Sequence, residues 1–419
     1  MIEATTPASG NAVLGPHNRL GPNARLAPNA RLGLYVHWPF CRAKCPYCDF
    51  NSHVSRDVDN AAFARAFRRE MQHLADLYSA GREISSIFFG GGTPSLMPPW
   101  LLDGILQDAE DIFGFSDGIE ITAEANPTST EAENLSAFKS AGVNRVSLGV
   151  QSMSDADLSF LGREHSVREA LQAVEVARQL FDRVSIDLIY ALHGQTAQRW
   201  EKELTSALQL GLDHMSLYQL TIESGTAFFA RNNAGEILTV DDDLAADLYL
   251  LTDDIMTAAK MPAYEVSNYA RPGSECQHNL IYWRAEDWIG IGPGAHSRIT
   301  KTGARGRERH GLATRRNPSS WLADIEKNGH GIDITTQDTL ADCVAERLMM
   351  GLRLSEGIDL GVFESQFGAL NRHIDPASIQ NFCQMGLLTQ TPDRLAATRD
   401  GRLVLNRILA DLLTDTASK

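Results

Sequence analysis

The stretch Tyr35-Val-His-Trp-Pro-Phe-Cys-Arg-Ala-Lys-Cys-Pro-Tyr-Cys-Asp-Phe50 holds three of the six cysteines of the chain, Cys41, Cys45 and Cys48, in the spacing Cys-x3-Cys-x2-Cys. Thiolates this close in sequence can bind one soft metal centre, because sulfur ligands select iron–sulfur clusters, zinc or Cu(I). A structural zinc ion takes a fourth protein ligand, and the next cysteine is distant, at Cys276. The spacing therefore favours a [4Fe–4S] cluster with one iron left open, and a zinc knot is the alternative.

The composition describes an ordinary globular protein. No apolar run approaches the ~18 residues of a membrane span. Few cysteines, half of them clustered, argue against a disulfide framework and for a reducing compartment. The net charge of −15 disfavours a broad nucleic-acid-binding surface. We therefore expect a cytoplasmic protein with no membrane span and no nucleic-acid partner.

Residues 1–32 are expected to form a mobile, low-complexity tail. Residues 15–32 are three imperfect hexapeptides, GPHNRL, GPNARL and APNARL. A proline in every repeat prevents a continuous helix, so this segment contributes no core.

Strand and helix patterns alternate from residue 33 onward. Expected strands cover residues 33–38, 84–89, 119–125, 145–150, 184–190 and 214–220. Phe63, Phe67 and Met71 mark one face of a helix between the first two strands, and Ser166 with Glu169 forms a capping box for another. Serial β–α units imply a parallel sheet. The predicted fold class is α/β, an open, partial (β/α)6 TIM-like barrel, in which sites gather at the carboxyl ends of the strands.

Polar motifs follow these predicted strands. Gly90-Gly-Gly-Thr-Pro-Ser95 allows a ligand to approach the backbone, and the Glu124 carboxylate could accept hydrogen bonds from ribose hydroxyls. The Arg163 guanidinium could bind a carboxylate at two points. Gln151, Asp187 and Gln219 end later strands. Each residue alone has an ordinary explanation as a strand-end polar group.

In this order, the motifs resemble the radical S-adenosylmethionine (SAM) superfamily, and within it the branch of oxygen-independent coproporphyrinogen III oxidase. The resemblance covers residues ~33 to ~415 and implies the same partial barrel. It implies a [4Fe–4S] cluster on Cys41, Cys45 and Cys48, and an electron donor to that cluster. The implied SAM contacts are Tyr35, Tyr47, Gly91, Gly92, Thr93, Glu124, Gln151, Arg163, Asp187, Gln219 and His296.

Gln277-His-Asn-Leu-Ile-Tyr-Trp283 is similar to the His-Asn-x-x-Tyr-Trp motif of the heme chaperones in this branch. His278 could be an axial ligand of heme iron, and Tyr282 and Trp283 offer flat faces to a porphyrin. Asn279 could bind a propionate or fix the imidazole tautomer. Cys276 could be a second ligand or an attachment site. The alternative is that His278 and Trp283 pack against the edge of the barrel.

Two departures separate the chain from the oxidase itself. The oxidase carries another cysteine two positions after the third, where this chain has Phe50, and it uses an ordered N-terminal extension. A heme chaperone that delivers heme to a hemoprotein is therefore the first hypothesis, and a SAM-dependent oxidative decarboxylase of coproporphyrinogen III is the second. An enzyme that modifies heme is a third. SAM cleavage, enzymatic activity and the choice between monomer and dimer stay open.

Three segments follow the predicted tail. Residues 33–300 are expected to form the barrel and an extension with the heme motif, and residues 301–335 a connecting segment whose charged run, Lys301 to His310, forms a solvated loop. Residues 336–415 are expected to form a small helical, winged-helix-like domain that packs on the barrel. Its helices are predicted at 339–353, 375–385 and 400–413, with Cys343 and Cys383 as core thiols.

Overall fold

The structure, a computed structural model, describes residues 31–55, 57–79, 81–303 and 306–414. Residues 1–30 of the expected tail lie outside these ranges, and Leu32 already begins the first strand.

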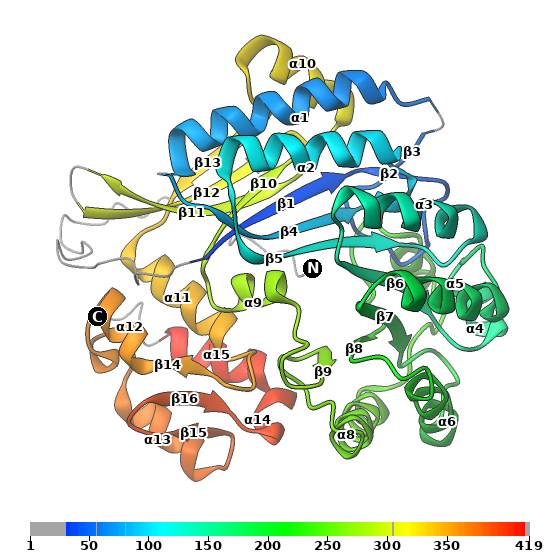
Figure 1. Cartoon of the computed structure of the whole chain (residues 1–419). Helices are drawn as coiled ribbons and strands as arrows, with labels where there is room; N and C mark the ends of the chain where they lie inside the picture. Colours follow the sequence, from blue (N-terminus) through cyan, green and yellow to red (C-terminus); the bar gives the residue numbers. More distant parts are fainter. Residues whose placement is uncertain (1–30, 56, 80, 304–305, 415–419) are drawn as a thin grey trace.

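Six parallel strands form the predicted partial barrel, and they lie side by side in chain order (Figure 1). They are β1 (Leu32–Trp38), β4 (Ile84–Gly91), β5 (Phe115–Ala125), β6 (Arg145–Gln151), β7 (Arg183–Tyr190) and β8 (His214–Gln219). The connecting helices are α1 (Asn60–Leu74), α2 (Pro99–Phe113), α3 (Ser129–Ala141), α4 (Asp155–Phe160), α5 (Val167–Leu180) and α6 (Ala197–Leu208). The capping box of Ser166 and Glu169 begins α5 as expected.

The two faces of these strands differ in chemistry. Leu34, Ile87 and Leu148 are fully buried in the core that the strands share with the helices. Because side chains alternate along a strand, the residues between them face the inside of the barrel. That inner face is polar: Ser147 and Ser185 on neighbouring strands hydrogen-bond at 2.7 Å between their Oγ atoms. The barrel interior is therefore built to hold polar groups.

An extension widens the sheet beyond β1. β10 (Asp287–Ile291) pairs with β1 in parallel, and β11 (His296–Gly303), β12 (Gly306–Thr314) and β13 (Ile332–Gln337) continue in antiparallel order. α10 (Pro318–Asn328) precedes β13. The prediction of a solvated loop from Lys301 to His310 is wrong, since most of this run lies in β11 and β12. Its charges were misleading because Arg309 is buried in ion pairs with Asp287 and Glu346.

Shorter elements complete the barrel. β9 (Asn268–Ala270) pairs with β8 in antiparallel order, after α7 (Ala227–Asn233) and α8 (Asp242–Ala258), and α9 (Gln277–Trp283) leads into β10. β2 (Phe40–Cys41) and β3 (His53–Val54) form a separate pair, and η1 (Ala75–Ser79) and η2 (Pro94–Leu96) are single turns.

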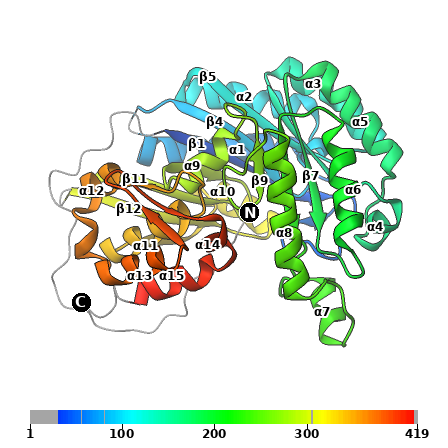
Figure 2. The same cartoon turned by 90° about the horizontal axis from the view of Figure 1, so that it is seen from below.

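The C-terminal domain has a core of its own and lies on the side of the barrel away from α4 to α6 (Figure 2). Its helices are α11 (Leu340–Gly351), α12 (Leu360–Phe367), η3 (Leu370–Arg372), α13 (Pro376–Gln384), α14 (Arg399–Leu403) and α15 (Leu405–Thr414). A small antiparallel sheet of β14 (Ile358–Asp359), β16 (Arg394–Ala397) and β15 (Leu388–Gln390) joins them. Cys343 is buried as expected, whereas Cys383 is only half-buried.

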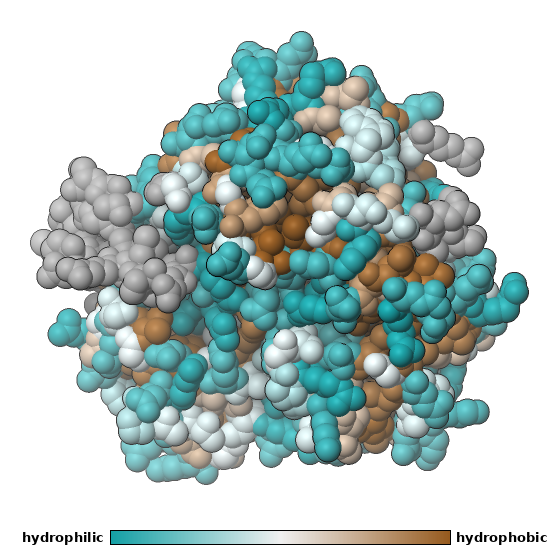
Figure 3. Space-filling model, viewed as in Figure 1, coloured by the Kyte–Doolittle hydropathy of each residue, from teal (hydrophilic) through white to brown (hydrophobic). Residues whose placement is uncertain are grey.

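In the part of the chain that the structure describes, no helix is both long enough and apolar enough to cross a membrane. Hydrophilic residues cover most of the face seen in Figure 3, and hydrophobic residues form separate patches on it.

Candidate functional site

The cysteine loop lies directly on the glycine loop that follows β4. The backbone N–H of Gly92 donates to the carbonyl of Trp38 at 2.7 Å, and that of Thr93 donates to the carbonyl of Phe40 at 2.9 Å. A Cβ atom at Gly92 would lie 2.8 Å from the Phe40 carbonyl oxygen, so the two loops can only be this close if residue 92 is glycine. The structure therefore brings the two motifs together at the carboxyl end of the sheet.

A chain of polar contacts connects two of the three cysteines. Thr93 Oγ1 donates to Cys41 Sγ at 3.4 Å and accepts from Asn126 Nδ2 at 3.2 Å. The Arg163 guanidinium donates to Asn126 Oδ1 and to Cys45 Sγ, the latter at 3.3 Å. The sequence analysis missed Asn126, although it stands two residues after Glu124. Its position directly after a strand, beside Glu124, was the available signal.

The surroundings of the cysteines suit a cluster of several irons. The Arg163 guanidinium places a positive charge within hydrogen-bond distance of the Cys45 sulfur. Tyr47 packs against Phe228 at 6.3 Å between ring centroids, which gives the loop an apolar support. Among the described residues, no three His, Cys, Asp or Glu side chains are gathered around one metal position. In a [4Fe–4S] cluster each thiolate binds a different iron, so three cysteines can hold such a cluster without surrounding one metal position.

Other predicted SAM contacts line the same end of the barrel. Burial raises the pKa of Glu124 to about 8, and the charge of Asp187 adds to this rise. The Asp187 carboxylate accepts from Ser147 Oγ at 3.1 Å, and Tyr35 bonds His37 at 3.0 Å. Gln151 has a φ of 70°, a left-handed conformation that costs energy in a residue other than glycine.

Two predicted contacts are placed differently. Gln219 Nε2 donates to the carbonyl of Ala245 on α8 at 2.7 Å, so this side chain turns toward the surrounding helices. His296 is exposed at the start of β11, the strand that pairs with β10 beside β1.

The heme motif lies on α9, at the opposite end of the barrel. His278 is fully buried beside Gly33, near the start of β1. Its Nδ1 bonds Ser86 Oγ at 2.8 Å and its Nε2 bonds Tyr282 Oη at 2.7 Å. Burial lowers the pKa of His278 to about 3, so the ring is neutral at physiological pH.

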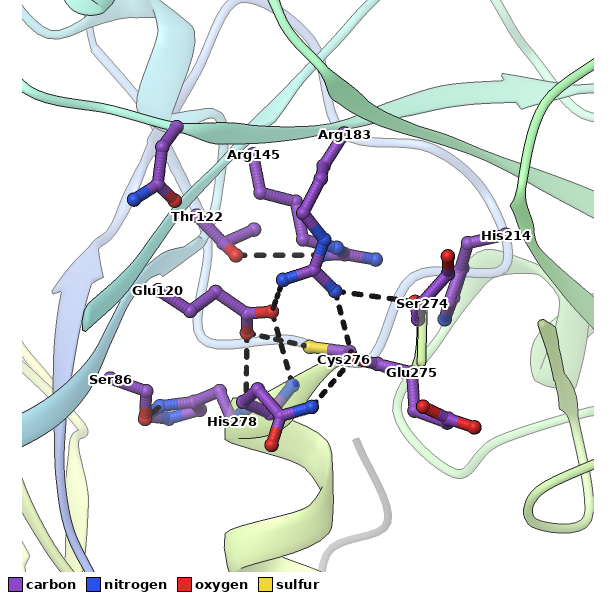
Figure 4. A network of polar contacts seen from close by, with 12 residues as sticks. Ser86, Glu120, Thr122, Arg145, Arg183, His214, Ser274, Glu275, Cys276 and His278 are labelled. Carbon is purple, nitrogen blue, oxygen red and sulfur yellow. Dashed lines mark hydrogen bonds and ion pairs between the residues drawn. The ribbon is translucent and has the colours of Figure 1, made fainter. Parts of the chain in front are cut away.

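Glu120 on β5 fixes the start of α9 (Figure 4). Its carboxylate accepts the backbone N–H groups of Gln277 and His278, each at 3.1 Å. Arg183 donates to Glu120 at 2.6 Å and to the carbonyl of Glu275 at 2.8 Å. No sequence motif pointed to Glu120 or Arg183. Glu120 lies on β5 and Arg183 on β7, so they come into contact only when the sheet places these strands on either side of β6.

The remaining motif residues differ in accessibility. Burial raises the pKa of Cys276 to about 12, and its thiol donates to Glu120, so a role as a second ligand or attachment site does not suit this buried thiol. Asn279 Nδ2 donates to Tyr264 Oη at 3.3 Å. Tyr282 and Trp283 are half-buried, and Trp283 lines a cavity toward the C-terminal domain.

Residues 35–207 match the family model of the radical SAM superfamily, and residues 338–404 match that of the HemN C-terminal domain. The radical S-adenosyl methionine domain-containing protein 1, mitochondrial, of Bos taurus is 38% identical over 91% of this chain and 87% of its own length. The heme chaperone HemW of Escherichia coli (strain K12) is 36% identical over 92% of this chain and 98% of its own length. The chain belongs to the HemW family of radical SAM proteins.

The solved structure of coproporphyrinogen III oxidase (HemN) from Escherichia coli shares the fold, with a TM-score of 0.77, 23% identity, and coverage of 94% of this chain and 92% of that one. This likeness confirms the predicted radical SAM barrel with a small C-terminal domain. Membership of the superfamily implies a [4Fe–4S] cluster and SAM. The HemW family also includes relatives named mitochondrial, so a cytoplasmic location stays an expectation.

Proposed function

We propose that this chain binds heme and transfers it to an acceptor hemoprotein, while a [4Fe–4S] cluster and SAM occupy the other end of its barrel. The observation that supports this most is the 36% identity to a heme chaperone over nearly the whole of both chains. The His-Asn-Leu-Ile-Tyr-Trp segment on α9 agrees with it, as does phenylalanine at position 50, where the oxidase has a further cysteine.

In this proposal Cys41, Cys45 and Cys48 bind three irons, and the bound cluster supplies an electron for the chemistry of SAM. Backbone groups of Gly91, Gly92 and Thr93 hold its methionine part. The remaining polar contacts are assigned to Tyr35, Tyr47, Glu124, Gln151, Arg163, Asp187, Gln219 and His296. Gln219 would have to release the Ala245 carbonyl to make this contact. Arg163 is the best supported of these contacts, since it already touches Cys45 and is half-buried at the cysteine loop.

Heme binding on α9 uses His278 as the axial ligand, with Asn279, Tyr282 and Trp283 around the porphyrin. A neutral imidazole is the form that binds iron, and His278 is held neutral by its burial. Its Nε2 is engaged by Tyr282, so heme uptake requires Tyr282 to release this nitrogen and α9 to expose it. In this proposal the structure with the His278–Tyr282 hydrogen bond is the heme-free form, and heme binding breaks that bond.

An anaerobic hemin titration followed by absorption spectroscopy tests the proposal. We expect a saturable Soret shift with the wild type, a weaker affinity in His278→Ala, and no change in the control His373→Ala, whose histidine lies in the C-terminal domain. Heme-loaded protein should then pass heme to apomyoglobin. Equal hemin binding by wild type and His278→Ala would remove His278 from the site. Turnover of coproporphyrinogen III would favour the oxidase instead.

A further inference from the structure

A cavity of about 270 Å³ lies between the end of α9 and the C-terminal domain. Trp283 forms part of its wall on the barrel side. Arg347 from α11, and Val362 and Phe367 from α12, form part of the opposite wall. Of the four proposed heme residues Trp283 lines the cavity, so the cavity adjoins the end of the proposed heme motif.

The carboxylates that line this cavity are already neutralised. Each has an arginine nitrogen within 4 Å. Arg309, for example, bridges Asp287 at 3.0 Å and Glu346 at 2.6 Å. The negative groups of the cavity thus have partners without using Arg347.

Arg347 is the exception among the charged groups of the cavity. It is only 8% exposed, and its Nε has no hydrogen-bond partner. One of its terminal nitrogens donates to the carbonyl of Arg284, and no ion pair to Arg347 occurs among the described residues. Burial lowers the pKa of Arg347, although Glu286 and Asp359 oppose this. A buried cation without an ion pair is costly unless something completes it.

The walls around this arginine are partly apolar, through Trp283, Val362, Phe367 and Leu354. Sites that enclose a whole drug-sized ligand measure ~300–1,000 Å³. A cavity of about 270 Å³ therefore accommodates one edge of a large flat molecule. We propose that this cavity binds a carboxylate-bearing edge of a tetrapyrrole, with Arg347 as the carboxylate ligand and Trp283 against the ring. This inference rests on the proposed heme function.

Hemin and hemin dimethyl ester separate carboxylate recognition from apolar binding. We expect Arg347→Gln to weaken hemin binding about tenfold or more and to leave binding of the ester unchanged. Arg353→Gln is the matched control. Arg353 lies just after α11, the helix that contains Arg347, and it too donates to a backbone carbonyl and has its pKa lowered by burial, but it does not line the cavity. It should bind both ligands like the wild type.

A second variant covers the case in which Arg347→Gln does not fold. Val362→Phe fills the cavity from α12 while keeping Arg347, and we expect it to weaken hemin binding as well. Wild-type hemin affinity in Arg347→Gln, or an equal loss for hemin and its ester, would overturn the inference and leave the proposed function standing. Absence of saturable hemin binding by the wild type would overturn both.

Discussion

At the carboxyl ends of the strands the cysteine loop lies on glycines, whereas at the amino ends α9 closes the barrel over buried charges. The first end is formed largely by backbone, as the contact between Gly92 and Phe40 shows. The second is formed by side chains from distant strands, with Glu120 and Arg183 holding α9. In barrels of this kind the carboxyl end carries the chemistry and the amino end mainly stabilises the fold. Here the amino end also carries a segment typical of heme chaperones. Tyr35 lies between the two ends, with its ring 6.5 Å from that of His278 and its hydroxyl 3.0 Å from His37 Nδ1.

Two buried glutamates, Glu70 and Glu120, differ in the charge of the groups around them, and their pKa values shift in opposite directions. Glu70 on α1 accepts only neutral donors, including the backbone N–H groups of Gly292 and Gly331, both at 2.8 Å. Burial raises its pKa to about 7. Burial also opposes ionisation of Glu120, but the charges of Arg145 and Arg183 and two backbone N–H groups outweigh it and lower the pKa. Burial alone therefore does not decide the charge of a carboxyl group in this fold.

The largest expected effect comes from removing the cysteines. Changing Cys41, Cys45 and Cys48 together to Ala should abolish the visible absorbance of the reconstituted cluster, because no described side chain nearby replaces the thiolates. Hemin affinity should stay within about twofold of the wild type, since α9 lies at the other end of the barrel. Parallel iron–sulfide reconstitution and hemin titration measure the two effects. Loss of hemin binding in a folded variant would show that the two ends are coupled.

The next largest effect concerns Glu120. Its replacement by Ala leaves Arg183 and the first N–H groups of α9 without their acceptor, and breaking a buried ion pair from one side costs about 3–5 kcal/mol. Urea unfolding followed by circular dichroism measures this loss. Glu175→Ala is the control, because Glu175 forms a solvent-exposed ion pair with Arg178 at 3.8 Å. Losing this pair should lower the free energy of unfolding by less than about 1 kcal/mol. Similar losses in both variants would contradict the assigned role of Glu120.

The smallest expected effect is a pair of opposite pH dependences. The raised pKa of Glu70 stabilises the fold fully below pH about 4.5, and this contribution, about 3 kcal/mol, is lost as pH rises to about 7. Ionised Glu120 stabilises the fold at pH values above its ordinary pKa of about 4.5. This contribution is lost as the pH falls below that value and through the lowered pKa of the folded state.

Unfolding free energies of the wild type, Glu70→Gln and Glu120→Gln from about pH 2 to pH 8 test these signs, because the Glu120 effect is lost only below its ordinary pKa. Each Gln variant should remove one of the two slopes. The same slope in Glu70→Gln and the wild type would mean that Glu70 keeps an ordinary pKa in the fold.

The sequence predicted the barrel strands well because each has its own local signal, a short apolar run with strand-end glycine or polar residues. The contacts of Cys41, Gly92 and Arg163 were also accessible, since they sit in recognisable motifs. The extension from β10 to β13 was not, because its place depends on β1, far away in sequence. Arg309 looked like a solvated charge for the same reason: Asp287 and Glu346, which neutralise it, are distant in the chain.

The placement of β1 between β4 and β10 has a consequence for how the protein is made. Arg31, just before β1, meets Glu286, just before β10, across 255 positions. At ~5–20 residues per second, a ribosome needs roughly 10–50 s to add that length. During this interval one side of an apolar strand, with Leu32, Leu34 and Val36, has no neighbour to pair with. The nascent chain therefore leaves this edge of β1 unpaired until residues 287–291 have been added.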